Sequence, residues 1–105
     1  MPQYAKPIDG DALDRAANLF GNRVKTSVIG FLRNNPNSGA KAIVDAIGVT
    51  RSLVKLRLSE LETEGLILAD PPRETRQRGD WPVYRVNDER VTELYLRLGQ
   101  EIAEM

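Results

Sequence analysis

The sequence of 105 residues contains no cysteine and no histidine. The missing cysteines exclude disulfides, thiolate nucleophiles and thiolate metal sites. The missing histidines remove the commonest general base and the commonest metal ligand in proteins. Nucleophilic catalysis by a Ser–His or Cys–His pair is therefore impossible. We expect a protein that is not an enzyme and that holds no metal and no cofactor.

The sequence also lacks any long apolar run. No segment approaches the ~18 apolar residues that a transmembrane helix needs, and the first residues lack the apolar core of a signal peptide. With 41% hydrophobic and 29% charged residues, the composition is that of a globular protein. The length suits one domain. We expect a single domain over residues 1–105 in the cytoplasm, associated with the nucleoid and with no membrane partner.

The charges balance overall but are unevenly distributed along the chain. The formal net charge is zero, from 15 basic and 15 acidic residues. Residues 23–87 carry eleven Lys and Arg against seven Asp and Glu, a net +4. Residues 1–22 carry two basic and three acidic residues, a net −1, and residues 88–105 carry two basic and five acidic residues, a net −3. A basic centre between acidic ends is compatible with a polyanionic partner at the centre.

Apolar residues at helical spacing, interrupted by Gly, Pro, Asn and Asp, predict a mainly α chain with one small β-hairpin. Residues 66–69 and 81–86 are the strand candidates, joined by a polar loop. The expected order is α-α-α-α-β-β-α. The helices are expected over 13–20, over 24–32, from an N-cap at Ser38 to Gly48, from an N-cap at Thr50 to Glu64 ahead of Gly65, and from Asn87 or Asp88 onward.

The most informative pattern is the segment 39–67, which reads GAKAIVDAIGVTRSLVKLRLSELETEGLI. A short helix, a turn centred on Gly48 and Val49, and a second helix over 50–64 form a helix-turn-helix arrangement. The second helix of such a pair enters the major groove of DNA with its first turns. Its predicted DNA-contacting residues are Thr50, Arg51, Ser52, Lys55, Leu56 and Arg57.

The polar loop over 70–81 is the second candidate for DNA contact. Arginines in a loop that follows a recognition helix suit phosphate contact or insertion into the minor groove. Trp81 and Tyr84, at the end of the loop and on the returning strand, are interpreted as packing residues that hold the hairpin down. The predicted contacts of this loop are Arg73, Arg76, Gln77 and Arg78.

The segment from Leu19 to about Leu98 resembles the winged helix-turn-helix domain of the ArsR family of bacterial transcription regulators. The helix before the helix-turn-helix is matched by GNRVKTSVIGFL, the helix-turn-helix by AIVDAIGVTRSLVKLRLSELETEGLI, and the wing with its returning strand by RQRGDWPVYRVND. The resemblance implies a winged helix-turn-helix fold and a DNA-binding transcription regulator. Metal-sensing members use Cys and His, both absent here, so metal sensing is not expected.

The resemblance also implies a homodimer formed by the first and last helices. Here those helices fall in residues 1–21 and 88–105, and each carries an apolar stripe at helical spacing. Such stripes serve as intramolecular core as well as interface, so both uses stay open. The predicted interface residues are Leu13, Ala17, Phe20, Val91, Leu94, Tyr95, Leu98 and Ile102.

Together these patterns predict a sequence-specific, dimeric repressor whose partner is double-stranded DNA. Leu53 and Leu56 leave a first alternative open, because two large aliphatic side chains on the recognition helix suit a protein partner. A second alternative is an architectural or recombination accessory protein that binds DNA and bends it.

Overall fold

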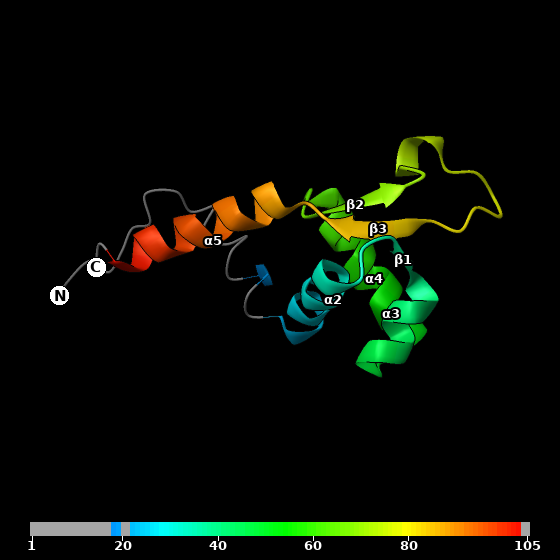
Figure 1. The fold of residues 1–105 in the computed structure, drawn as a ribbon, viewed down its shortest axis with the longest axis horizontal. Helices are drawn as coiled ribbons and strands as arrows, with labels where there is room; N and C mark the ends of the chain where they lie inside the picture. The colour runs from blue at the N-terminus through cyan, green and yellow to red at the C-terminus, as the bar shows by residue number, and fades with distance from the viewer. Residues whose placement is uncertain (1–17, 20–21, 104–105) are drawn as a thin grey trace.

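The computed structural model describes residues 18, 19 and 22–103, with side chains described as far as residue 100 (Figure 1). Within this range the chain forms helices on either side of a hairpin, as predicted, and one further strand. In chain order the elements are α2 (Arg23–Asn34), β1 (Ser38–Gly39), α3 (Ala40–Ile47), α4 (Arg51–Thr63), β2 (Ile67–Asp70), the 3-10 helix η1 (Arg73–Thr75), β3 (Val83–Val86) and α5 (Asp88–Ala103).

The ends of the helices follow from local capping. The side chain of Asn22 accepts a hydrogen bond from the Lys25 amide at 3.0 Å and begins α2. The hydroxyl of Thr50 accepts one from the Leu53 amide at 3.3 Å and begins α4, which confirms the predicted cap. Gly48 ends α3 with a φ of 79°, a left-handed conformation that costs glycine little.

The start of α3 differs from the prediction. Ser38 is not the cap of this helix; Gly39 is, and it supplies no side-chain hydrogen bond. Ser38 and Gly39 instead form β1, which pairs antiparallel with β3 opposite Tyr84 and Val83. The predicted two-stranded hairpin is therefore a three-stranded sheet in the order β1-β3-β2. The backbone donors and acceptors of this segment are used by a distant strand rather than by α3.

The hairpin is shorter than predicted at its far end. β2 and β3 pair antiparallel from Ile67 opposite Val86 to Asp70 opposite Val83. Trp81 and Pro82 precede β3, so they lie in the connecting loop. We call this connection, residues 71–82, the wing.

The core lies where α2, α3 and α4 pack against one another and against the sheet. Residues of α4 at helical spacing, Val54, Leu58 and Leu61, are fully buried, as the sequence pattern predicts. Among the described residues, the other buried apolar ones are Leu19, Val28, Ile29, Leu32, Ile43, Leu66, Ile67, Tyr84, Val91 and Leu94.

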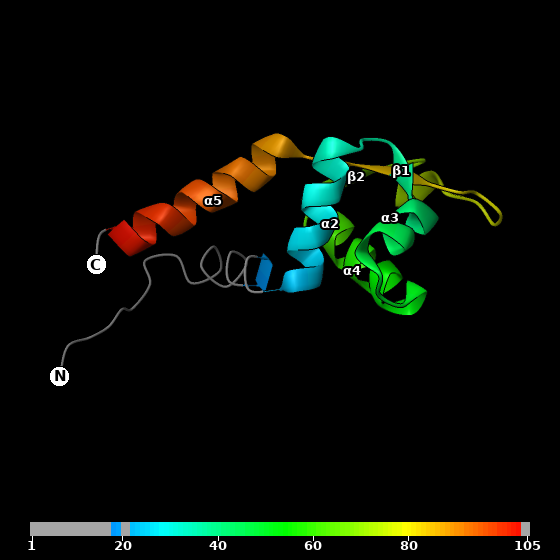
Figure 2. The ribbon, with the colours of Figure 1, turned by 60° about the horizontal axis from the view of Figure 1, so that its bottom comes forward.

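The last helix, α5, packs on this core with one face only, through Val91, Leu94 and Leu98. Val91 and Leu94 are buried, whereas Tyr95 and Leu96 are 63% and 56% exposed. Figure 2 shows α5 projecting away from the body formed by α2, α3 and α4. In the part of the chain that the structure describes, no helix has the length and apolar character to cross a membrane.

Candidate nucleic-acid interface

A groove of about 680 Å³ runs between the wing, one flank of α4 and the start of α3. We call it the α4–wing groove. Its walls carry five cationic side chains against two carboxylates, so it is electropositive. The charged residues that line it are Lys41, Arg51, Lys55, Arg73, Arg76, Glu62 and Asp80.

The floor of the groove follows from the helical repeat of α4. Arg51, Lys55, Ser59 and Glu62 recur at intervals of three and four residues, so they lie along one flank beside the buried stripe. Arg51 and Lys55 are exposed, and neither has an ion-pair partner among the described residues. Lys41, on α3, lines the same groove. It is also exposed and has no ion-pair partner among the described residues. The structure therefore brings predicted contacts Arg51 and Lys55 together.

The outward face of α4 carries Ser52 and Leu56, which lie opposite the buried stripe. Both are exposed, and Leu56 retains 52% of its surface. Leu53 is half-buried, so of the two leucines only Leu56 has a side chain exposed enough to contact a partner. The hydroxyl of Thr50 is occupied by its capping hydrogen bond, which leaves the start of α4 fixed.

Arg57 lies on the other flank of α4, away from Arg51 and Lys55. Its Nη1 donates to Glu60 Oε1 at 2.6 Å, and that carboxylate lies 3.7 Å from Lys25 Nζ. The hydrogen bond from Arg57 lowers the pKa of Glu60, and the charges of Lys25 and Arg57 act in the same direction against the effect of burial. The structure thus does not bring Arg57 together with the other predicted contacts.

Lys25 is a residue that the sequence analysis missed. Only 1% of it is exposed, and its Nζ donates to Glu64 Oε1 at 3.0 Å and to Asn18 Oδ1 at 3.4 Å. The sequence does indicate that Lys25 lies on the buried face of α2, because this residue stands at helical spacing from Val28, Ile29 and Leu32. With Glu60, it ties α2 to the second half of α4.

The predicted wing arginines Arg73 and Arg76 hold the wing against α4. Arg76 Nη2 lies 3.1 Å from Glu62 Oε2, and Arg73 Nη2 lies 3.7 Å from Glu62 Oε1. Arg73 also donates to the hydroxyls of Ser59 at 2.9 Å and Thr63 at 3.1 Å. Glu62 is only 13% exposed, so its charge is shielded from the groove by the two guanidinium groups. We call these contacts the wing latch.

Tyr84 lies in the sheet beneath the wing latch and is buried, which agrees with its predicted packing role. Burial raises the pKa of the Tyr84 hydroxyl, and the nearby arginines of the latch oppose that effect. The hydroxyl therefore stays neutral across the physiological range.

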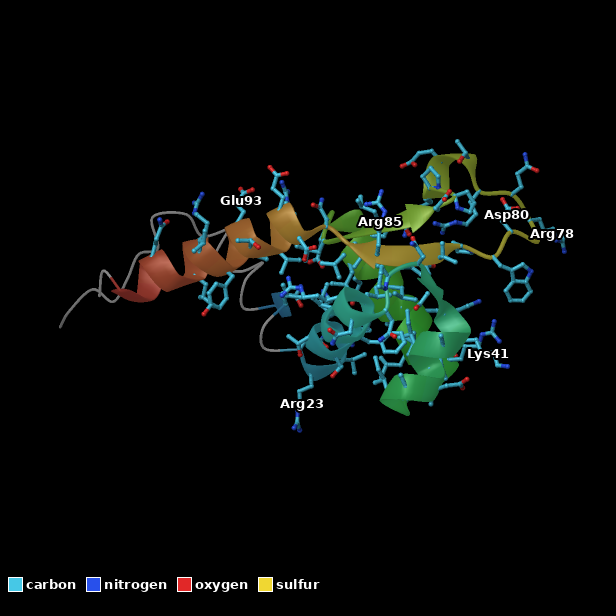
Figure 3. All side chains as sticks on the ribbon, viewed as in Figure 1. Arg23, Lys41, Arg78, Asp80, Arg85 and Glu93 are labelled. Atoms are coloured by element: carbon cyan, nitrogen blue, oxygen red, sulfur yellow. The ribbon has the colours of Figure 1, made fainter. Side chains whose placement is uncertain are left out.

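The tip of the wing is a tight turn from Gln77 to Asp80. The Asp80 amide donates to the Gln77 carbonyl at 3.0 Å, and the Gln77 amide donates to Asp80 Oδ2 at 2.7 Å. Gly79 has a φ of 93°, which the turn requires and which favours glycine. Arg78 lies at the far end of the wing and has no ion pair in the described ranges (Figure 3).

The predicted packing role of Trp81 is wrong, because its side chain is 80% exposed. Pairing of β2 with β3 stops at Val83, so residue 81 lies beyond the sheet that would have covered it. The hairpin is instead held down by Tyr84 and the wing latch. Trp81 lines the α4–wing groove from the wing side.

The predicted interface residues fall into four groups. Val91 and Leu94 are buried within the single chain, Leu98 is half-buried against the core, and Tyr95 is exposed. Tyr95 and Val91 also line an apolar pocket of about 400 Å³ between α5 and α2. Leu13, Ala17, Phe20 and the side chain of Ile102 lie outside the described residues.

No family model and no curated protein matches the sequence. Solved structures do match its fold. One is the homodimeric winged helix-turn-helix DNA-binding domain (fragment 1–100) of a possible ArsR-family transcriptional regulator from Mycobacterium bovis, with a TM-score of 0.61, 19% identity and coverage of 97% of this chain and 91% of that one. Another is a possible transcriptional regulator for arsenical resistance, with a TM-score of 0.60, 16% identity and coverage of 90% and 96%.

A third similar structure is the PcaV transcriptional regulator from Streptomyces coelicolor in complex with its natural ligand. Its TM-score is 0.52 at 19% identity, and the match covers 99% of this chain and 79% of that one. The fold is therefore that of a winged helix-turn-helix domain, with α3 and α4 as the helix pair. The predicted fold class is confirmed, with β1 as an addition.

Proposed function

We propose that this protein is an ArsR-like transcription regulator that binds double-stranded DNA through α4 and the wing. The observation that carries the proposal is the division of charge around the α4–wing groove. Arg51 and Lys55 are exposed and unpaired among the described residues, whereas the nearby carboxylate of Glu62 is neutralised by the wing latch. Unpaired cations along one groove are the electrostatic feature that phosphates require.

In this proposal α4 enters the major groove with its first turns. Arg51, Ser52 and Lys55 lie there, where they reach base edges and phosphates. The backbone amides at the start of α4 add the positive end of the helix dipole. Arg78 then contacts the backbone or the minor groove, while Arg73 and Arg76 position the wing.

We further propose that the regulator is a homodimer and a repressor. The M. bovis domain of the same fold is homodimeric, and α5 here presents Tyr95 and Leu96 to solvent. A two-fold dimer places two recognition helices in successive major grooves ~34 Å apart. Such a complex blocks polymerase from the sites that it covers. The predicted residues of the first helix, Leu13, Ala17 and Phe20, remain part of this interface proposal.

The test is a titration of fluorescein-labelled random-sequence duplex with the protein at several salt concentrations, read by anisotropy. Binding is expected to weaken steeply with salt, because several cations displace condensed counterions. Arg51→Ala and Lys55→Ala are each expected to weaken binding about tenfold or more on a preferred site selected from the pool. Arg23→Ala is the matched control, since Arg23 is also exposed but lies away from the wing (Figure 3).

Unchanged affinity in both α4 variants would overturn the assignment of the interface. Loss of affinity in Arg23→Ala to the same degree would show a non-specific charge effect and would overturn it as well. Circular dichroism of each variant verifies that the fold is kept, which is expected because all three side chains are exposed.

A second candidate function is supported by Leu56, which is 52% exposed in the middle of the outward face of α4. That side chain suits an apolar protein partner as well as thymine methyl groups. Salt discriminates the two functions, because an apolar contact with a protein does not weaken steeply with added salt. Bending of the bound duplex with no preference for any sequence, measured by energy transfer between its ends, identifies an architectural protein.

A further inference from the structure

The wing carries the only tryptophan of the sequence, and that side chain is open to solvent. Trp81 is 80% exposed, although tryptophan is on average highly buried in folded proteins. The remaining residues from 71 to 80 are polar, charged, proline or glycine. The indole is therefore the one large apolar side chain of the wing, and its neighbours along the wing are mostly polar or charged.

The backbone on both sides of Trp81 is fixed. On one side the turn from Gln77 to Asp80 is closed by two hydrogen bonds of 3.0 and 2.7 Å. On the other side the Pro82 carbonyl passes 3.7 Å from the position of a β-carbon on Gly39, and Val83 pairs with Gly39 in the sheet. The backbone that carries the indole is thus set before any partner binds, which lowers the entropic cost of using this side chain.

The surroundings of Trp81 favour nucleic acid as the partner. It lines the α4–wing groove together with Lys41, Arg51 and Lys55. Arg78, three residues earlier, is exposed and has no ion pair among the residues described. Figure 3 places Arg78 at the wing tip and Lys41 at the same end of the molecule. An apolar ring between cations matches a DNA groove, where phosphates flank the apolar faces of sugars and bases.

We infer that Trp81 enters the DNA minor groove next to the major-groove site of α4 and packs its ring against a base step. The inference rests on the proposed function and deepens it. Arg78 lies beside it and contacts the flanking phosphates. Apolar side chains that enter the minor groove partly unstack a base step and kink the duplex. The wing then prefers flexible pyrimidine–purine steps beneath it, which adds specificity without hydrogen bonds to bases.

The single tryptophan makes the test direct. Unlabelled random-sequence duplex is added to the full chain, and the emission of Trp81 is recorded. The duplex is about three helical turns long, so that it covers both the site of α4 in the major groove and the site of the wing in the minor groove. Binding is followed in parallel by the anisotropy of labelled duplex. We expect the emission to be quenched along the same curve as the anisotropy rises. Netropsin, which occupies the minor groove, is expected to restore the emission.

Variants of the wing supply the second readout. Trp81→Ala is expected to weaken DNA binding at least about fivefold, the lower end of the loss seen when a stacked aromatic residue is removed. Trp81→Phe is expected to keep most of the affinity, because it keeps an aromatic ring. Leu68→Ala is the control, since Leu68 is a partly exposed apolar residue on β2 that does not line the groove.

The outcomes separate this inference from the proposed function. DNA binding with unchanged Trp81 emission, or with Trp81→Ala as tight as the wild type, overturns the inference and leaves the proposed function standing. Quenching that netropsin does not reverse excludes the minor groove and overturns it too. A blue shift that depends on protein concentration alone assigns Trp81 to protein contact. Absence of DNA binding at low salt overturns both proposals.

Discussion

Replacement of Lys25 by methionine is expected to lower the free energy of unfolding by about 2 kcal/mol. Methionine keeps the apolar stem, so the core packing of α2 is preserved while the charge and its hydrogen bonds are removed. The lost contacts are the 3.0 Å hydrogen bond to Glu64, the 3.7 Å ion pair with Glu60 and the 3.4 Å hydrogen bond to Asn18.

The magnitude lies between two limits. Removing one partner of a fully buried ion pair costs about 3–5 kcal/mol, whereas an exposed pair contributes about 0–1 kcal/mol. Lys25 is 1% exposed, but the carboxylates of Glu60 and Glu64 are 38% and 20% exposed. Water therefore solvates the two carboxylates in part after the substitution, and Glu60 keeps its bond to Arg57. The loss of unfolding free energy in Lys25→Met therefore lies between these two limits, at about 2 kcal/mol. This loss corresponds to a melting temperature lower by about 8–16 °C.

The assay is urea unfolding followed by far-UV circular dichroism at one fixed protein concentration, because self-association would couple stability to concentration. The emission of Trp81 is unsuitable, since this side chain is exposed in the folded state already. Arg33→Met is the control, because it removes the 3.0 Å ion pair with Asp88, whose two partners are 52% and 69% exposed. We expect the control to lose less than about 1 kcal/mol. Equal losses in Lys25→Met and Arg33→Met would refute the argument that burial sets the value of the ion pair.

Two further predictions follow from the other ion pairs of α4. Glu62→Gln removes the charge with which Arg73 and Arg76 are paired. We therefore expect trypsin to cleave the wing faster, while the helical circular dichroism signal is kept. Unchanged cleavage would show that the wing latch does not hold the wing. The pKa of Glu60 is lowered below its ordinary value of 4.5, so its ionised form stabilises the fold above that pH and the contribution is lost as the pH falls through the folded-state pKa. The free energy of unfolding of the wild type should therefore exceed that of Glu60→Gln by about 0.2–1 kcal/mol at neutral pH, and the two should be equal in strong acid. A difference that persists in acid would contradict the conclusion that the ionised form of Glu60 stabilises the fold.

The helices and their ends could be predicted from the sequence because their causes are local. Apolar residues at helical spacing select the buried face of α4, and that face is the one formed by Val54, Leu58 and Leu61. Thr50 caps the following amides by a bond across three residues. Gly48 adopts a left-handed conformation that is open mainly to glycine. These features determined the helix-turn-helix and the flank of α4 on which Arg51 and Lys55 lie.

The strand β1, by contrast, is decided by tertiary structure alone. Ser38 and Gly39 form only two residues of strand, too few for any alternation to appear in the sequence. Their partners on β3, Tyr84 and Val83, are more than forty residues away along the chain. A serine before a helical segment has the local signature of a cap, and pairing with a distant strand overrides it.

The availability of each charged or aromatic side chain also depended on the folded chain. The sequence places Arg73, Arg76 and Arg78 in one loop, but only the fold brings Glu62 beside the first two and leaves the third without an ion pair in the described part of the chain. Likewise, whether Trp81 packs or projects depends on where the pairing of β2 with β3 ends. Periodicity along one helix is local and fixes which face is buried. Ion pairs and exposure depend on which distant residues meet, and that is set by the packing of the whole domain.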